Sequence, residues 1–214
     1  MTLFDGMGPR NRRLRAFLRR RARTAPTARA GLDRAHRDRL FCRRAVVFTD
    51  CADFTVRTLR DGILHFLMVF EAAAAGTAAV VRRTGGELLK VDADSLLILY
   101  PSVASACRGV DAIEAFLHRF NVGRPAREQA HFSYGVGFGD VLDLDGDAFG
   151  AEVNLASKIG EDLARPGEVL LTPGAADALS PARRRRLVRH AAIRFDDRRI
   201  LVQRLRARSA RPAR

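Results

Sequence analysis

The chain has 214 residues, 47% of them apolar, with three cysteines and no tryptophan. This length and composition suit one globular domain with an appendage, and they exclude a disordered chain and a small disulfide-stapled one. The formal charge of +14 would fit a protein that binds nucleic acid or an anionic membrane. However, all but two of the 38 basic residues are arginines, which indicates a compositional bias along the whole chain, and the two lysines are Lys90 and Lys158.

Residues 1–40 form an arginine-rich arm with few apolar side chains. Leu14, Phe17 and Leu18 recur at helical spacing, which predicts a short amphipathic helix that Pro26 would end. A charge run of this kind favours a solvated, partly helical extension. Two alternatives remain open: a contact with a membrane surface or a partner protein, and a transit peptide.

Targeting and membrane signals are weak in this sequence. It shows no signal-peptide pattern, and the longest apolar stretches, such as Gly62 to Ala75, contain His65 and Glu71 and fall short of a membrane span. The cysteines are odd in number and show no metal-ligand spacing, which favours a reduced environment. We therefore expect a cytoplasmic protein.

A compact domain is predicted at 41–206, followed by a basic tail at 207–214. Apolar runs predict strands at 45–50, 87–91, 95–100, 131–138, 140–144 and 168–171, and two final strands between 187 and 205. Helical patterns cover 56–83, with an interruption at Asp61-Gly62, and then 102–120, 149–163 and 173–179. The second and third strands should form one hairpin, and the fourth and fifth another. This order predicts an α+β fold of the ferredoxin-like βαββαβ type with extra C-terminal strands.

Two aspartates are placed to meet at one edge of this predicted sheet. Asp50 ends the first strand, and Asp94 lies at the tip of the hairpin between the second and third strands. Because the first strand of a ferredoxin-like sheet lies between its neighbours, we expect the two carboxylates to lie close together. Such a pair suits hard cations such as Mg²⁺ or Mn²⁺, and two such ions about 4 Å apart serve in-line phosphoryl transfer. The alternative is that both are ordinary turn residues.

Five stretches, taken in order, resemble the motifs of the class III nucleotidyl cyclases, and together they span about 45–180. Segment 47–55 (VFTDCADFT) resembles the first metal motif of that family, and 90–94 (KVDAD) resembles the second. Segment 134–139 (YGVGFG) is similar to the glycine-rich strand, 147–158 (DAFGAEVNLASK) to the nucleotide-binding turn and helix, and 167–171 (GEVLL) to the strand that follows.

The resemblance implies a palm-type cyclase domain that converts ATP to 3′,5′-cyclic AMP and pyrophosphate as a homodimer. Asp50 and Asp94 would then hold two Mg²⁺ or Mn²⁺ ions, one activating the ribose 3′-hydroxyl and one steadying the leaving pyrophosphate. Backbone amides at a helix start would cradle the triphosphate. The residues that match this cradle are Cys51, Ala52, Asp53, Phe54 and Thr55.

Four further residues match positions that bind the nucleoside in this family. Lys90 would donate to adenine N1 and Asp147 would accept from the exocyclic amine, which implies ATP rather than GTP. Asn154 would orient the ribose, and Lys158 stands where the family usually has an arginine that neutralises the transition state. The metal aspartates would come from one protomer and these four residues from the other, so a monomer would be inactive. Both lysines of the chain fall on these positions.

Four positions depart from the family pattern. Asp53 and Ala93 replace glycines, Gly137 stands where a histidine is common, and Lys158 offers a point charge where arginine offers a fork. The departures at the first two positions and at Lys158 keep open a catalytically weak cyclase-homology domain that binds nucleotide as a regulatory module. A nucleic-acid binder is a third alternative that rests on net charge alone, and we expect no specific nucleic-acid partner because the chain is only 7% aromatic and shows no recognised motif.

Overall fold

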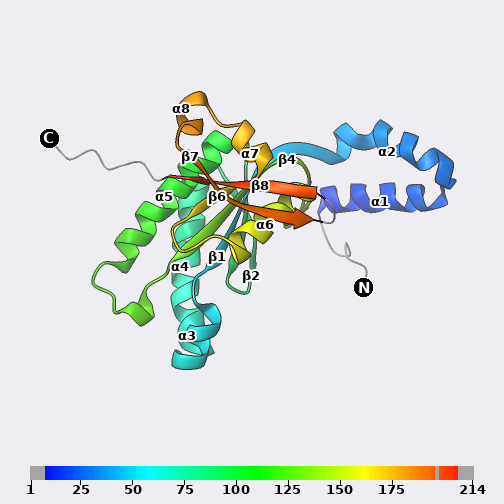
Figure 1. Cartoon of the computed structure of the whole chain (residues 1–214). Coiled ribbons are helices and arrows are strands. Elements are labelled where there is room, and N and C mark those ends of the chain that lie inside the picture. The colour runs from blue at the N-terminus through cyan, green and yellow to red at the C-terminus, as the bar shows by residue number, and fades with distance from the viewer. Residues whose placement is uncertain (1–7, 196–197, 207–214) are drawn as a thin grey trace.

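The structure, a computed structural model, describes residues 8–195 and 198–206. The tail predicted at 207–214 and the start of the arm, 1–7, lie outside these residues. An eight-stranded sheet forms the body, with β1 (Phe41–Cys51) near its middle (Figure 1). The strand order is β2-β3-β1-β4-β6-β8-β7, with β5 pairing to β4. This order confirms the ferredoxin-like arrangement with additional C-terminal strands.

Strands and helices mostly fall where the hydrophobic pattern predicts them. The remaining strands are β2 (Glu87–Asp92), β3 (Ser95–Tyr100), β4 (Phe132–Leu144), β5 (Asp147–Phe149), β6 (Val169–Leu171), β7 (Leu187–Phe195) and β8 (Arg198–Leu205). The helices are α1 (Pro9–Arg23), α2 (Pro26–Leu40), α3 (Phe54–Asp61), α4 (Ile63–Arg83), α5 (Val103–Asn121), α6 (Ala151–Asp162), α7 (Pro173–Asp177) and α8 (Pro181–Arg184), with a 3₁₀ turn at Ala126–Glu128. The interruption expected at Asp61-Gly62 is the junction of α3 and α4, where Gly62 has φ +86°.

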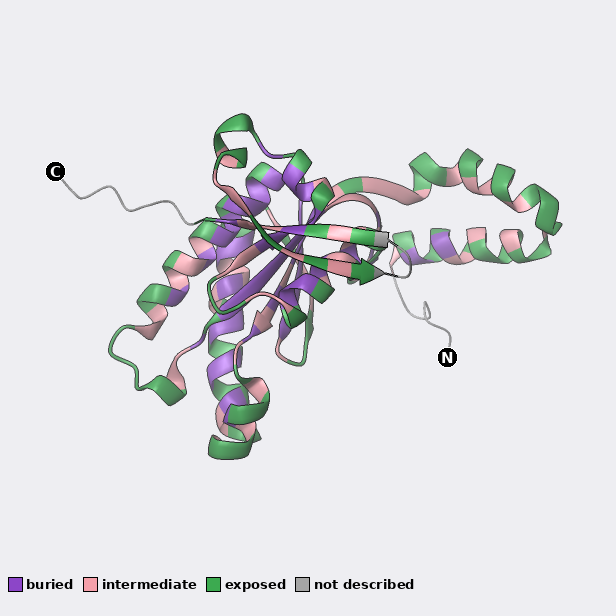
Figure 2. Ribbon diagram, viewed as in Figure 1, coloured by how far each residue is buried: buried purple, intermediate pink, exposed green. Residues whose placement is uncertain are grey.

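Both faces of the sheet are covered, so β1 is buried on both sides. Ala45 and Val47 face a core built with α4 and α5, whereas Val46 faces a second core that includes Ala156 of α6. Successive side chains of a strand point to opposite faces, which is why a continuous apolar run fits here. Figure 2 shows the buried residues concentrated in the sheet and on the inward sides of these helices.

Two glycines let α6 lie unusually close to the sheet. A Cβ on Gly135 of β4 would lie 1.9 Å from the carbonyl oxygen of Ala156, and one on Gly160 of α6 would lie 3.0 Å from the amide of Gly135. The glycine-rich pattern of β4 therefore reflects a backbone-to-backbone approach that side chains would prevent. This approach fixes the height of α6 over the sheet edge where Asp50 lies.

The hairpin predicted between 131–138 and 140–144 is wrong. Residues 132–144 form the single strand β4. This strand pairs with the full length of β1, from Phe41↔Leu142 to Cys51↔Phe132. The long partner strand keeps Gly139 extended, and the chain turns only at Asp145-Gly146, where Gly146 has φ +86°. Because β5 then takes Asp147–Phe149, the helix predicted from 149 begins at Ala151.

Helix α4 is longer than the apolar stretch expected at 62–75. By length and composition it could cross a membrane, so the expectation that this stretch falls short of a span was wrong. However, Phe66, Phe70 and Val81 are buried against the sheet, as in the core helix of a globular domain. This packing accounts for the apolar residues on the buried side of α4, whereas Leu64 and Met68 on its other side are exposed.

The part of the arm that the structure describes is a pair of antiparallel helices beside the body (Figure 1). Helix α1 ends at Arg23, and Pro26 starts α2 instead of only ending α1, because proline is accommodated in the first turn of a helix. The rings of Phe17 and His36 contact each other across the pair at a tilt of 40°, with centroids 5.2 Å apart. The segment predicted as a partly helical extension is thus a helical hairpin that contacts β1 and β4.

Candidate functional site

Asp50 and Asp94 meet at the sheet edge, as expected from the ferredoxin-like order. The amide of Cys51 donates to the carbonyl oxygen of Asp94 at 3.0 Å, which ties the end of β1 to the tip of the β2–β3 hairpin. The Ser133 hydroxyl donates to the carbonyl oxygen of Gly160 at 2.8 Å and lies 3.4 Å from that of Asp50. Three elements, β1, β4 and α6, are therefore joined directly beside the two carboxylates.

The electrostatics of this edge favour a cation. Burial, followed by the negative charges of Asp94 and Glu161, raises the pKa of Asp50 to about 7. Burial also raises the pKa of Asp94. Within 8–195 and 198–206, neither aspartate has a salt bridge to a basic side chain, and no three His, Cys, Asp or Glu side chains form a ready metal cluster. Two half-buried carboxylates that repel each other are donors of the kind that a hard divalent cation fits.

A hollow of about 390 Å³ opens beside Asp94. It is bounded by β2, β3, β5 and α6, so it combines the hairpin tip with the turn and helix that follow β4. The polar side chains that line it belong to Lys90, Asp92, Asp94, Ser95, Asp147, Asn154, Ser157 and Glu161. One chain thus brings Asp94 together with three of the residues expected to bind the nucleoside.

Lys90 lies between two carboxylates in this hollow. Its Nζ is 2.9 Å from Asp92 Oδ2 and 3.8 Å from Asp147 Oδ2. The hydrogen bond with Asp92, followed by the charge of Asp147, raises the pKa of Lys90 despite some desolvation. The ammonium therefore stays protonated, and Asp147 remains close enough to act with it.

Lys158 lies outside the hollow. It is half-exposed and forms an ion pair with Asp162 one turn further along α6, which raises the pKa of its ammonium. Asn154, one turn before Lys158, is exposed and does line the hollow. The structure therefore unites Lys90, Asp147 and Asn154 and separates Lys158 from them.

The expected phosphate cradle is only partly available. The amides of Cys51 and Ala52 donate to the carbonyl oxygens of Asp94 and His131, at 3.0 and 2.9 Å. The amides of Asp53, Phe54 and Thr55 make no backbone hydrogen bond in the described chain, as is usual at the start of a helix such as α3. An anion would thus meet the last three residues of the predicted set.

Left-handed backbone occurs at the two positions where the family pattern has glycine. Asp53 has φ +63° and Ala93 has φ +52°, the only positive φ values among the described residues other than glycine. Such a conformation costs roughly 1–2 kcal/mol for a residue with a Cβ. The Asp53 side chain is exposed, and Arg60, whose nearest partner is Asp61, is the cation that its charge affects.

Arg57, which the sequence places near Asp53, faces the interior instead. Its guanidinium donates to the carbonyl oxygen of Arg127 at 2.9 Å and lies over the ring of Phe66. The carboxylate of Asp53 therefore has no ion-pair partner in the described chain. The backbone carbonyl oxygen of Asp53 accepts a hydrogen bond from the amide of Arg57.

Two functional candidates were missed in the sequence. Glu161 lines the hollow and acts on Asp50, while burial and Asp162 raise its own pKa and the hydroxyl of Ser157 lowers it. Asp92 is the nearest partner of Lys90. Glu161 lies two helical turns after Asn154, and Asp92 lies two residues after Lys90 in a strand. Residues at these spacings share one face of a helix or a strand, so the spacing could have identified both candidates.

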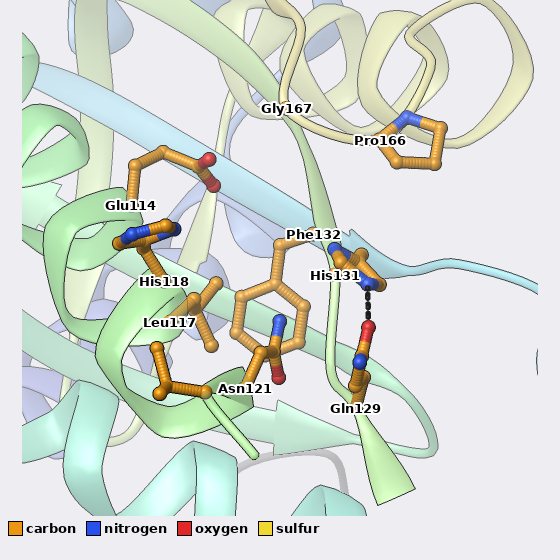
Figure 3. A pocket seen from close by; sticks show the side chains of 10 residues that line it. Glu114, Leu117, His118, Asn121, Gln129, His131, Phe132, Pro166 and Gly167 are labelled. Carbon is orange, nitrogen blue, oxygen red and sulfur yellow. Dashed lines mark hydrogen bonds between the residues drawn. The ribbon is translucent and has the colours of Figure 1, made fainter. Parts of the chain in front are cut away.

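A second hollow, of about 420 Å³, lies between the end of α5 and the loop before β6 (Figure 3). Glu114 and His118 of α5 extend into it, and His131 and Phe132 lie opposite. Glu114 accepts a hydrogen bond from the buried hydroxyl of Tyr134 at 2.6 Å. None of the residues predicted from the sequence lines this hollow.

Several solved structures share the fold of this chain. No protein-family model and no curated protein matches the chain. Solved structures that match include an adenylate/guanylate cyclase/hydrolase from Silicibacter pomeroyi, with 20% identity over 77% of this chain and 96% of that one and a TM-score of 0.61. The guanylate cyclase domain from Catenaria anguillulae in complex with GTP has 16% identity, coverages of 78% and 97%, and a TM-score of 0.62. The adenylyl cyclase CyaB from P. aeruginosa has 14% identity, coverages of 79% and 96%, and a TM-score of 0.62. The fold is therefore that of class III cyclase catalytic domains, as the motifs predicted.

The backbone strain at Ala93 predicts a stabilising substitution. Ala93→Gly should raise the free energy of unfolding by about 1 kcal/mol, because glycine adopts a positive φ without steric cost. The matched control is Ala72→Gly on the exposed side of α4, which should lower it by about 1 kcal/mol. Urea denaturation of both variants measures the difference, and a loss of stability at both positions would contradict the strain at Ala93.

The raised pKa of Asp50 predicts an unusual pH dependence of stability. The pKa is about 7 in the folded protein against an ordinary value of 3.8, so the folded state binds more protons between these values. The stability of the metal-free protein should therefore fall as pH rises from about 4 to about 7. Above pH 7, Asp50→Asn should be more stable than the wild type by on the order of 1 kcal/mol, after allowing for solvent screening at this half-exposed site.

Thermal unfolding in EDTA from pH 4 to 8 tests this expectation. Asp177→Asn, an exposed aspartate on α7, is the control and should leave the profile unchanged. Added Mn²⁺ should stabilise the wild type more than Asp50→Asn. Parallel pH profiles for the wild type and Asp50→Asn would show that Asp50 carries no such charge penalty.

Proposed function

We propose that this protein is a nucleotidyl cyclase that converts ATP to 3′,5′-cyclic AMP and pyrophosphate. The observation that carries the proposal is the pairing of Asp50 with Asp94 at adjacent ends of the sheet, in a fold shared with cyclase catalytic domains. In this reaction the ribose 3′-oxygen forms a bond to the α-phosphorus as the bond to pyrophosphate breaks, and the hydroxyl proton passes to solvent. No water is consumed, so the protein acts as a lyase.

Asp50 and Asp94 would hold two Mg²⁺ or Mn²⁺ ions. When bound, such ions lower the pKa of the 3′-hydroxyl and neutralise charge on the phosphates. The protein's own task at this edge is to hold two carboxylates adjacent, which the hydrogen bond from the Cys51 amide to the Asp94 carbonyl supports. The amides of Asp53, Phe54 and Thr55 would accept the triphosphate at the start of α3.

Lys90 and Asp147 support adenine as the base. The protonated ammonium of Lys90 can donate to adenine N1, and the carboxylate of Asp147 can accept from the exocyclic amine. Guanine presents the opposite polarity at both positions, so the pair favours ATP over GTP. Since structures of both adenylyl and guanylyl cyclases share this fold, the preference for ATP rests on these two side chains.

Asn154 and Lys158 would complete the site across a homodimer. Asn154 is exposed beside the hollow and can orient a ribose, whereas Lys158 must leave Asp162 before its ammonium can reach a phosphate. In a site shared by two protomers, these exposed residues would contact the nucleotide that is bound to the metal aspartates of the other protomer. Exposed apolar side chains along α3 and α4, among them Leu59, Leu64 and Met68, supply surface of the kind that a dimer buries.

A nucleotide-binding module without turnover is the second candidate. It is favoured by three observations: the left-handed Asp53, the left-handed Ala93, and the ion pair that engages Lys158. These features weaken phosphate binding and transition-state stabilisation and leave Lys90 and Asp147 intact. Such a module would bind ATP mainly through its base and release it unchanged.

The first test is turnover of ATP, GTP, CTP and UTP by the purified protein with Mg²⁺ or Mn²⁺. We expect cyclic AMP as the main product and at least about a hundredfold loss of rate in Asp50→Asn, because the metal pair loses a ligand. The Asp177→Asn variant should keep the wild-type rate. Binding of ATP without any cyclic product from a confirmed dimer would select the regulatory module instead.

The second test asks whether two protomers share each site. Asp50→Asn and Asn154→Ala should each be inactive alone, but mixed dimers hold one site in which both residues are intact. Random reassociation of equal amounts should then restore about a quarter of the wild-type rate, since half of the dimers are mixed and each has one working site. No recovery after verified subunit exchange would place all of these residues in a site formed by one chain.

A further inference from the structure

The helical hairpin α1–α2 is fastened to the turn between β4 and β5. The backbone amide of Asn11 donates to Asp145 Oδ2 at 3.0 Å, and its side-chain amide donates to the carbonyl oxygen of Asp145 at 3.2 Å. Gly8, at the N-cap of α1, has no side chain to accept these amides, and a Cβ there would lie 2.6 Å from Asp145 Cγ. Asp145 therefore caps α1 from a different element of the fold.

Ion pairs extend this attachment along β4. Asp143, whose side chain is 5% exposed, pairs with Arg10 of α1 and lies 3.5 Å from Arg44 of β1. Arg37 of α2 pairs with Asp140. A buried carboxylate is costly without its cations, so the β4–β5 turn keeps this geometry as long as α1 stays in place.

The same turn carries Asp147. Asp143 is the register partner of Ala148, and Leu144 is the register partner of Asp147, so the residues that α1 holds face the start of β5. Only Gly146 separates Asp145 from Asp147. Asp147 in turn lies 3.8 Å from Lys90. A continuous path of short contacts thus runs from Arg10 and Asn11 to the pair that we assign to base recognition.

The burial of Asn11 shows that this contact is built into the fold. Asn11 is 1% exposed, although α1 is strongly basic and most of its side chains are exposed. The hairpin has twelve arginines and two aspartates between 8 and 40, so it concentrates positive charge, yet it directs Arg10 and Arg37 onto two acidic residues of β4. A free solvated extension would bury no polar residue of this kind.

We propose that Arg10 and Asn11 are positioning residues that set Asp147 for base recognition by way of the β4–β5 turn. The proposal rests on the proposed nucleotide site, and it makes α1–α2 the element through which a signal could reach that site. When α1 is docked, Asp147 is held beside Lys90. When α1 is released, the turn loses its cap and its cations, and recognition of the base weakens.

The first experiment measures the turn directly, in the full-length protein without nucleotide. Hydrogen exchange of the amides of 143–149 should become about tenfold faster in Arg10→Gln/Asn11→Ala, because a hydrogen-bonded charged attachment is lost. The control is Arg19→Gln/Thr27→Ala, which makes the same change of charge and size at exposed positions of the hairpin. Arg10→Lys, which keeps the charge, should stay near the wild type. Equal exchange in the test and control variants, or a uniform rise over the whole chain, would overturn the attachment.

The second experiment measures the consequence for the nucleotide. In Arg10→Gln/Asn11→Ala, the KM for ATP should rise and the ATP-to-GTP ratio of kcat/KM should fall at least about threefold, with kcat less affected, because Asp147 contacts the base and not the reacting atoms. Faster exchange with an unchanged ratio would overturn control of base recognition. A wild type without turnover would refute the proposed function, and the exchange experiment would still decide whether α1 holds the turn.

Discussion

Two like charges held together at one edge of the sheet are the constraint on which the candidate site depends. The amide-to-carbonyl bond between Cys51 and Asp94 leaves little freedom for the carboxylates to separate, and partial burial deprives both of solvent. An isolated fold would gain stability by removing one of them. Under the proposed function, a divalent cation at this edge would offset the repulsion among the carboxylates of Asp50, Asp94 and Glu161.

Strain is found at the same place as charge. Among the described residues other than glycine, the left-handed backbone is confined to Asp53 and Ala93, three residues after Asp50 and one before Asp94. Each turn must bend sharply to bring its aspartate to the edge, and glycine would do so without cost. The pairing of β1 is regular on both sides, with β3 from Ala45 to Asp50 and with β4 from Phe41 to Cys51. The strained backbone conformations and the repulsion between carboxylates therefore occur together in one small region.

The parts of the fold that the sequence predicts well are those set by local pattern. The apolar run of β1, the break at Gly62 and the β2–β3 hairpin follow from side-chain periodicity and glycine alone, and the position of Asp94 follows from them. The β4–β5 turn was misplaced because Gly139 looks like a turn until the eleven-residue partner strand is known. Likewise, no local signal shows that the Lys158 ammonium pairs with Asp162, or that the Cys51 amide is used by Asp94, since both depend on which groups lie nearby in space.

The acidic residues of β4 and of the turn after it divide between the arm and the hollow. Along β4 and the turn, Asp140, Asp143 and Asp145 engage the arm and β1, and only Asp147 is left to face Lys90. If the first three were absent, the nearby guanidinium groups would compete for Asp147, because arginine binds a carboxylate with two parallel hydrogen bonds and lysine does not. Arg10 and Arg37 of the arm are thus paired with Asp143 and Asp140, and neither arginine lines the hollow. Under the proposed function, this arrangement leaves the compact ammonium of Lys90, and not a guanidinium, to face the base beside Asp147.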